Sequence, residues 1–291
     1  MIERFHSDWE RSARASAGTT WHTLTVLDPD VLDGKLDVLA GELRRLDRVV
    51  VAFSGGADSA FLAAVAHHTL GERAHAVTAV SPSLAGAERD DCRALSEEWG
   101  LRWTPVETHE MERAAYRIND TDRCFHCKAE LMDVVGPIAA AERATVVLGV
   151  NTDDLADHRP GQNAALEAGA VFPLVAAGFT KDDVRAASRE LGLRTWDKPA
   201  AACLASRIPH GTAVSIGLLS TIDRAEAALK GLGFRNVRVR HYGETARIEL
   251  GADELAGAIE LRLAIVDAIR AVGYRYVTLD LEGFRSGNLN R

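Results

Sequence analysis

One short stretch of the chain, Ser54-Gly55-Gly56-Ala57-Asp58-Ser59, has the residue types of an anion-binding loop. Glycines lack a Cβ atom, so backbone N–H groups can curl around phosphate oxygens, and a helix that follows points its positive end at the same place. The two serine hydroxyls add donors. Asp58 would repel a phosphate, so its expected role is to hold a magnesium ion or to cap the loop backbone. The loop lacks the lysine of a Walker A motif, and a plain strand-to-helix turn is the alternative interpretation.

Cysteines are the second set of reactive residues, and the chain has four: Cys92, Cys124, Cys127 and Cys203. Cys124 and Cys127 lie three residues apart at the expected start of a helix, so they share a face. The neighbouring Arg123 and Lys128, together with the helix N-terminus, are expected to lower the pKa values of both thiols. In a reducing compartment such a pair is more typical of metal binding or redox chemistry than of a disulfide.

Plainer interpretations exist for each cysteine. A zinc half-site would explain the C-x-x-C pair, but structural zinc takes four ligands and the sequence has no second pair. Cys203 lies in an alanine-rich stretch and Cys92 in a polar helical stretch. Either could be a buried apolar side chain, as most free cysteines are.

Composition and charge narrow the class of protein. The chain has 291 residues, of which 47% are hydrophobic and 26% charged, as in an ordinary globular protein with a main domain and a smaller one. The net charge of -8 and the lack of a basic arm argue against nucleic acid as a partner. No apolar run approaches the roughly 20 residues of a membrane span, and no signal peptide is evident. We therefore expect a cytoplasmic localisation, reduced thiols and no membrane partner.

Apolar periodicity predicts alternating strands and helices up to about residue 205. Strands are expected at 48–53, 75–80, 102–106 and 145–149, and helices at 59–69, 86–99, 128–142 and 181–191. This alternation is typical of a Rossmann-like α/β fold with a doubly wound, mostly parallel sheet. A helix at 220–231, a hairpin at 237–250, a helix at 254–272 and a strand at 276–281 then predict a smaller α+β domain. The expected divisions are a weakly structured extension at 1–34, a main domain at 35–205 and a C-terminal substrate-binding or oligomerisation domain at 206–291.

The 54–59 loop resembles the PP-loop, S-G-G-x-D-S, of the ATP pyrophosphatases. The resemblance implies that ATP is bound with Mg²⁺ and cleaved between its α and β phosphates, while the loop holds the pyrophosphate leaving group. It makes Ser54, Gly55, Gly56, Asp58 and Ser59 contacts to ATP or pyrophosphate, with Asp58 a catalytic residue. Asp154, which follows a predicted strand, is expected to help with ATP or magnesium. The motif does not indicate which nucleophile attacks the activated substrate.

Six stretches occur in the order seen in the LarE family, the ATP-dependent sulfur transferases of nickel-pincer nucleotide cofactor synthesis. They are SGGADS, RCFHCK, NTDDLADHRPG, ACLASRIPHGT, VRVRHYGETARIEL and LEGFRSGNLN, and the resemblance covers about residues 35 to 291. It implies a pyridinium mononucleotide substrate with ring carboxylates, one of which is adenylated before sulfur displaces AMP.

The resemblance leaves two sources for the sulfur. In one branch of the family, the catalytic residue matching Cys203 gives up its own sulfur and becomes dehydroalanine. In another branch, three cysteines hold a 4Fe–4S cluster that carries the sulfide. Cys124, Cys127 and Cys203 match that set, so we favour the cluster branch and keep the sacrificial one open.

The same resemblance implies residues that contact the substrate phosphate. Arg238 and Arg240 alternate along one predicted strand, so both guanidinium groups lie on one face and suit a phosphate. Ser206 and Arg207 are expected to assist at that phosphate, and Glu226 to contact the ribose. A solvent-facing strand with two unrelated arginines is the alternative. The resemblance also implies a homo-oligomer, with other nickel-pincer biosynthesis proteins as partners.

Three other functions fit part of the pattern. A tRNA-thiolating PP-loop enzyme would need a basic surface or an RNA-binding module, which the sequence lacks. An ammonia-dependent amidating ligase would not need the C-x-x-C pair or the stretch around Cys203. A non-enzymatic module that senses ATP would not need the polar clusters beyond the loop.

Overall fold

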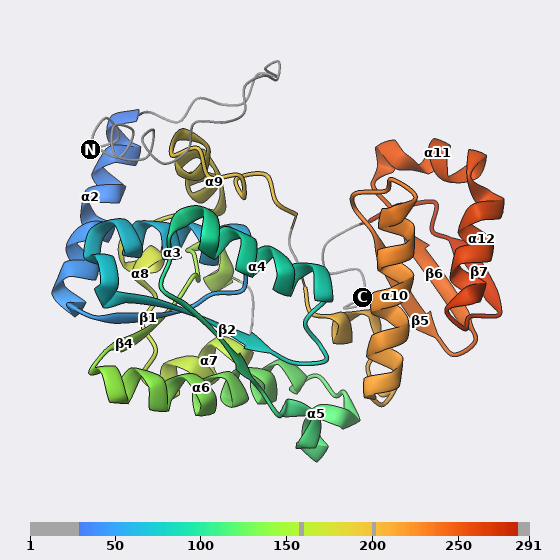
Figure 1. Ribbon diagram of the computed structural model, residues 1–291, viewed down its shortest axis with the longest axis horizontal. Coiled ribbons are helices and arrows are strands. Elements are labelled where there is room, and N and C mark those ends of the chain that lie inside the picture. Colours follow the sequence, from blue (N-terminus) through green and yellow to red (C-terminus); the bar gives the residue numbers. More distant parts are fainter. Residues whose placement is uncertain (1–28, 157–159, 200–201, 285–291) are drawn as a thin grey trace. The chain divides into compact units, whose positions relative to one another are not determined.

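Residues 29–156, 160–199 and 202–284 are described by the computed structural model, and the chain divides into two units (Figure 1). Unit 1 lies within residues 1–79, 91–106 and 131–198, and unit 2 lies within residues 80–90, 107–130 and 199–291. Unit 2 therefore contains the expected C-terminal domain together with residues 199–205 and two earlier segments. These earlier segments begin at the last residues of two strands of the first sheet, at Val80 and Glu107. Their order in the sequence does not show with which of the two units they pack.

A parallel sheet with the strand order β3-β2-β1-β4 forms the centre of unit 1. Its strands are β1 (Val49–Ala52), β2 (Ala74–Val80), β3 (Trp103–Glu107) and β4 (Thr145–Leu148). β1 pairs in parallel with both β2 and β4, and Val50 lies opposite His75 and Val146. The predicted α/β class is thus confirmed, and each strand begins and ends within one residue of its expected range.

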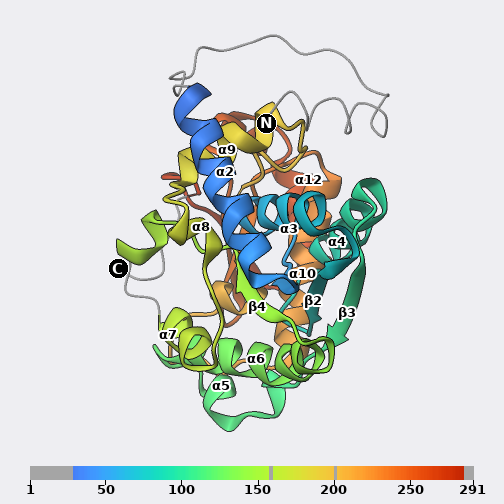
Figure 2. The ribbon, with the colours of Figure 1, turned by 90° about the vertical axis from the view of Figure 1, so that its left-hand side faces the viewer.

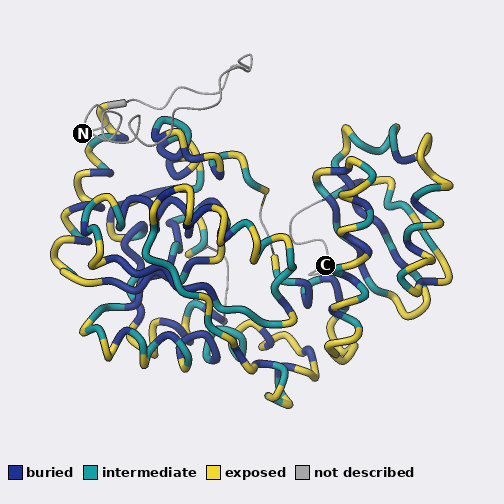
Figure 3. The backbone as a smooth tube through the Cα atoms, in the orientation of Figure 1, coloured by how far each residue is buried: buried dark blue, intermediate teal, exposed yellow. Residues whose placement is uncertain are grey.

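Helices cover both faces of this sheet because alternate residues of β1 point to opposite sides (Figures 1 and 2). Val49 and Val51 share a buried cluster with residues of α2 (Pro29–Leu46), α3 (Ala57–Leu70), α4 (Gly86–Trp99), α8 (Pro173–Ala176) and α9 (Lys181–Glu190). Val50 lies in a second cluster with α6 (Arg123–Glu142) and α7 (Pro160–Glu167). The colouring in Figure 3 shows the resulting buried core. Helix α2 buries Leu32, so residues 29–34 are helical and not weakly structured, whereas residues 1–28 lie outside the described residues.

A second sheet, of order β5-β6-β7, belongs to unit 2. Its strands are β5 (Arg238–Tyr242), β6 (Thr245–Glu249) and β7 (Tyr276–Leu279), and the unit's helices include α5 (Ala114–Ile118), α10 (Ile216–Gly231), α11 (Leu255–Glu260) and α12 (Arg262–Ala271). β5 and β6 form the expected antiparallel hairpin, and β7 runs parallel to β6. The prediction of a single helix at 254–272 is wrong, because the helix is interrupted at Leu261 and forms α11 and α12. No glycine or proline at that position signals the interruption.

Gly149, the residue after β4, allows that strand to end against the start of α3. A Cβ atom at this position would lie 2.8 Å from the carbonyl carbon of Asp58 and 2.8 Å from the backbone nitrogen of Ser59. Both atoms are backbone, so neither can move aside as a flexible side chain would. The close approach brings the chain that follows β4 to the 54–59 loop.

We predict that Gly149→Ala destabilises the protein by about 1–3 kcal/mol, because the added methyl group overpacks a backbone contact. Gly41→Ala is the matched control, since that glycine lies inside α2 and a Cβ atom there meets nothing within 4 Å. It should stabilise the helix by roughly 0.5–1 kcal/mol. Urea unfolding measures both, and equal effects from the two substitutions would contradict the role given to Gly149.

Candidate functional site

The 54–59 loop turns between β1 and α3 in the way that its glycines predict. Gly55 has a φ of 71°, which favours glycine, and Gly56 is the extended N-cap of α3. The hydroxyls of Ser54 and Ser59 lie 3.0 Å apart, and Ser59 Oγ accepts the backbone N–H of Ser54 at 3.2 Å. The loop therefore gathers hydroxyl groups and the first backbone N–H groups of a helix, which are donors suited to phosphate oxygens.

Asp58 forms an ion pair within unit 1. Its Oδ2 lies 2.5 Å from Nζ of Lys181, and its Oδ1 accepts from Nδ2 of Asn151 at 3.1 Å. Asn151 is fully buried, and its side-chain oxygen accepts the N–H groups of Asp153 and Asp154. Asn151 thereby joins Asp58 to Asp154, and the structure brings these predicted ATP contacts together. Residues 157–159 of the same stretch lie outside the described residues.

Two lysines at the loop were not predicted from the sequence. Lys198 donates to the carbonyl oxygen of Gly55 at 3.0 Å and pairs with Asp91 at 2.5 Å, and Lys181 is the partner of Asp58. Both come more than a hundred residues after the loop, so no local spacing links them to it. Lys181 directly follows Thr180, the N-cap of α9. A lysine at this position is common on helix surfaces, so it gave no signal of a functional role.

Cys127 and Cys203 share one hydrophobic cluster of unit 2, whose other members include Tyr116 and Leu204. Cys203 immediately precedes the 3₁₀ helix η4 (Leu204–Arg207), and Cys127 lies in the first turns of α6. Cys124, one helical turn before Cys127, is exposed. The predicted helix start is confirmed, and two of the three expected sulfur ligands pack against the same cluster.

Cys92 belongs to the buried cluster of unit 1, as its plainer interpretation predicts. A Cβ atom at Gly55 would lie 2.8 Å from its sulfur, so Cys92 packs directly beneath the loop.

The expectation that nearby cations lower both thiol pKa values is wrong for Cys127. Burial, and secondly the neighbouring Cys203, raise the pKa of Cys127 to about 12, and Lys128 only partly opposes them. Arg123 is turned elsewhere: its guanidinium donates to the side-chain oxygen of Asn119 and to the carbonyl of Ala205.

Asn119 holds the segment after Cys203 in place. It adopts a left-handed conformation with a φ of 62°, and its buried side chain donates to the carbonyl oxygens of Ile208, Pro209 and Thr212. Its side-chain oxygen accepts from Arg123 at the start of α6. A single asparagine thus links the segments that carry Cys127 and Cys203, and no sequence spacing signals it.

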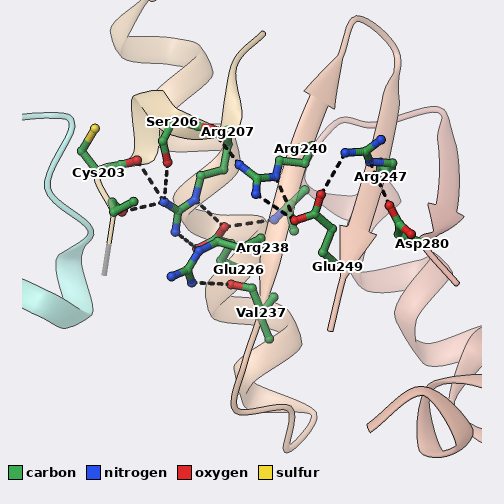
Figure 4. Close-up of polar contacts among 12 residues, drawn as sticks. Cys203, Ser206, Arg207, Glu226, Val237, Arg238, Arg240, Arg247, Glu249 and Asp280 are labelled. Carbon is green, nitrogen blue, oxygen red and sulfur yellow. Dashed lines mark hydrogen bonds and ion pairs between the residues drawn. The ribbon is translucent and has the colours of Figure 1, made fainter. Parts of the chain in front are cut away.

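Arg207 and Glu226 form a buried, two-pronged ion pair beside Cys203 (Figure 4). Nε and Nη2 of Arg207 donate to the two carboxylate oxygens of Glu226 at 2.8 and 2.9 Å. Nη1 donates to the carbonyl of Cys203 at 2.9 Å and to Oγ of Ser206 at 2.9 Å. Glu226 also accepts the N–H of Val239 at 3.0 Å, so its oxygens are committed within the protein. The ribose contact expected for Glu226 stays a prediction.

Arg240 is also engaged by buried partners. It donates twice to Oε2 of Glu249, at 3.0 and 2.8 Å, and once to the carbonyl of Ser206 at 2.8 Å. The other oxygen of Glu249 accepts from Arg247 at 2.9 Å, and Glu249 has no exposed surface. Arg240 thus ties β5 to the segment that carries Cys203.

Arg238, two residues before Arg240 on β5, lies close enough to Arg207 and Arg240 to be affected by both positive charges. It donates to the carbonyl of Val237 at 2.8 Å and lies 4.9 Å from the ring centre of Phe284. Burial, and then the positive charges of Arg207 and Arg240, lower its pKa to about 10, although Glu226 opposes them. The structure therefore brings the predicted phosphate contacts together, and a bound anion would stabilise the charged form of Arg238.

Neither a metal site nor a membrane span stands out among the residues described. Within 29–156, 160–199 and 202–284, no three His, Cys, Asp or Glu side chains are grouped so that they could hold a metal ion. The helices of these residues include none with the length and apolar character needed to cross a bilayer.

Comparison with known proteins gives full-length relatives, although no family model matches the chain. A pyridinium-3,5-bisthiocarboxylic acid mononucleotide synthase of Lactiplantibacillus plantarum is 37% identical over 258 residues, which are 88% of this chain and 94% of that protein. An uncharacterized protein of Synechocystis sp. is 43% identical over 264 residues, covering 90% of this chain and 98% of the relative. A more distant protein of Methanocaldococcus jannaschii is 24% identical over 240 residues.

The raised pKa of Cys127 predicts slow alkylation of the metal-free protein. At pH 8 iodoacetamide should modify the exposed Cys124 first, and the Cys127 rate should rise about tenfold per pH unit until its pKa is approached, because only the thiolate reacts. Fragment-ion mass spectrometry separates the two residues. Unfolded protein is the control, since its thiols titrate near about 8.5. A Cys127 that reacts at neutral pH as fast as in the unfolded chain would refute the shift.

Proposed function

Because the chain belongs to the LarE family of pyridinium-3,5-bisthiocarboxylic acid mononucleotide synthases, we propose that it is an ATP-dependent sulfur transferase acting on a pyridinium biscarboxylate mononucleotide. The observation that carries the proposal lies in unit 2, where Arg207 and Arg240 bind the carbonyl groups of Cys203 and Ser206. A sulfur-bearing residue is thereby fixed beside a buried arginine cluster suited to the substrate phosphate.

Activation of the carboxylate is assigned to the 54–59 loop. A carboxylate oxygen of the substrate attacks the α-phosphorus of ATP, the bond to the bridging oxygen breaks, and pyrophosphate leaves with the electron pair. The serine hydroxyls, the N–H groups of α3, Lys181 and Lys198 stabilise the departing charge. Asp58 is compensated by Lys181. If Asp58 takes up the Mg²⁺ that accompanies ATP, it must exchange this partner, which frees Lys181 for a phosphate.

Sulfur transfer then consumes the acyl adenylate. A sulfur nucleophile attacks the acyl carbon, the carbon–oxygen bond to the nucleotide breaks, and AMP leaves. In the sacrificial route the nucleophile is Sγ of Cys203, and loss of its α-proton with cleavage of its Cβ–S bond leaves dehydroalanine and a thiocarboxylate. Figure 4 shows Sγ of Cys203 directed away from the arginines, while its carbonyl oxygen faces Arg207.

An iron–sulfur cluster fits the donors of this corner in chemical type, because thiolates are its usual ligands. Cys127 and Cys203 already share a hydrophobic cluster, and the exposed Cys124 lies one helical turn from Cys127. In the described structure the three thiols are not grouped closely enough to hold a metal ion, so a 4Fe–4S cluster on them would require their rearrangement. Such a cluster would leave one iron without a protein ligand, and this iron could carry the sulfide for transfer. We propose this as the sulfur source in preference to the sacrificial route.

The proposed activity is tested with ATP, sulfide and the biscarboxylate mononucleotide under anaerobic conditions. We expect AMP, pyrophosphate and a product in which sulfur replaces one carboxylate oxygen, and Cys203→Ser should abolish the thiocarboxylate. Mass spectrometry identifies the product. Ammonia-dependent formation of a carboxamide that survives Cys203→Ser would contradict sulfur transfer and favour an amidating ligase, and turnover that requires tRNA would favour tRNA thiolation.

The source of the sulfur is tested by analysis of anaerobically purified or reconstituted protein. We expect roughly four iron and four acid-labile sulfide per chain, with a broad visible absorption band that is lost in Cys124→Ala. An iron-free protein that resists reconstitution, together with loss of one hydrogen sulfide from Cys203 per turnover, would show the sacrificial route instead.

Arg238→Ala should weaken binding of the mononucleotide by about 2–5 kcal/mol, on the order of 30- to 5,000-fold, because the contact of a half-buried arginine with the phosphate is lost. Arg235→Ala is the matched control, since this exposed arginine pairs only loosely with Asp253, at 3.5 Å. Calorimetry measures both affinities. Equal affinities in the two variants would contradict the phosphate site.

A further inference from the structure

Tyr116 carries a buried hydroxyl without a hydrogen-bond partner, a property that the proposed function does not explain. It lies on α5, its side chain is 1% exposed, and within the described part of the chain its oxygen makes no hydrogen bond. Burying an unpaired hydroxyl is unfavourable, because the group has given up its bonds to water. Such a group in a native structure needs an explanation, and a partner that binds later provides one.

Sulfur atoms are the reactive neighbours of this hydroxyl. Cys127 and Cys203 pack against the cluster that contains Tyr116, and both interact with it electrostatically. Ser83 is the polar side chain that interacts with the Tyr116 hydroxyl, but the two groups do not meet hydrogen-bond geometry. The Ser83 hydroxyl instead donates to the carboxylate of Glu110 at 2.7 Å. The carbonyl of Ser83 accepts the N–H of Leu204, which fixes the residue next to Cys203. The corner is thus ordered before any sulfur species is loaded.

We propose that Tyr116 is a positioning residue whose hydroxyl donates a hydrogen bond to the sulfur anion carried at Cys127 and Cys203. The inference rests on the proposed function, and it applies to a cysteine thiolate and to a cluster-borne sulfide alike, since both are sulfur acceptors. Hydrogen bonds to sulfur orient it and tune its reactivity. The neighbouring Glu110 cannot donate this hydrogen bond when it is ionised, because a carboxylate only accepts hydrogen bonds.

Tyr116→Phe tests the inference because it removes one oxygen atom and keeps the ring that fills the cluster. We expect kcat for thiocarboxylate formation to fall about 10- to 100-fold, with the KM values for ATP and mononucleotide unchanged. Tyr274→Phe is the matched control, since Tyr274 is also buried in unit 2 but its hydroxyl already pairs with His241 at 3.3 Å. That control should leave kcat unchanged.

A second readout uses protein without substrates, so it remains informative if the wild type forms no thiocarboxylate. If the protein holds a cluster, its midpoint potential should be more negative in Tyr116→Phe, because a donor to sulfur favours the reduced state. If it is free of iron, alkylation of Cys203 at pH 8 should be slower. A Tyr116→Phe protein that matches the wild type in the applicable substrate-free readout overturns the inference. Absence of thiocarboxylate from the wild type contradicts only the proposed function.

Discussion

Buried positive charge is the constraint on which the candidate substrate site depends. Arg207, Arg238 and Arg240 approach one another inside unit 2, and each would be unfavourable there without a partner. Glu226 binds Arg207 with both oxygens, and Glu249 binds Arg240. Arg207 and Arg240 also donate to the backbone carbonyls of Cys203 and Ser206. The contacts that neutralise these two charges therefore also fix the segment that carries the Cys203 thiol. In the proposed function, Arg238 joins these two arginines in binding the substrate phosphate.

In unit 1, the groups suited to binding an anion are backbone N–H groups and two lysines. A loop that receives a leaving pyrophosphate must gather donors without a large side chain in the way. Two glycines and the first turn of α3 provide the donors, and Gly149 allows the chain after β4 to come within contact of that turn. Lys181 and Lys198 add positive charge, each held by a carboxylate in the described structure. Those ion pairs hold both lysines at the loop, where the proposed function has them bind phosphate.

Local patterns account for what could be predicted from the sequence. The strands follow from short apolar runs bounded by turn residues, and the position of Arg238 and Arg240 on one strand follows from its two-residue period. The start of α6 at Cys124 and Cys127 was predicted from the helical pattern that follows them. Lys181, Lys198, Asn119 and Tyr116 were missed because their importance arises from contacts between residues far apart in the chain. The error over the Cys127 pKa has the same origin, since burial by distant residues outweighs the charge of its neighbour Lys128.

The central claim is that the two chemical steps use separate ligand sites, ATP at the 54–59 loop and the mononucleotide phosphate at the arginines of unit 2. Hydrogen–deuterium exchange with each ligand alone tests it most directly. The account predicts that ATP slows exchange in residues 53–60 and 149–154, and that the mononucleotide slows exchange in residues 203–208 and 238–242. Protection of residues 203–242 by ATP with no change at 53–60 would contradict it.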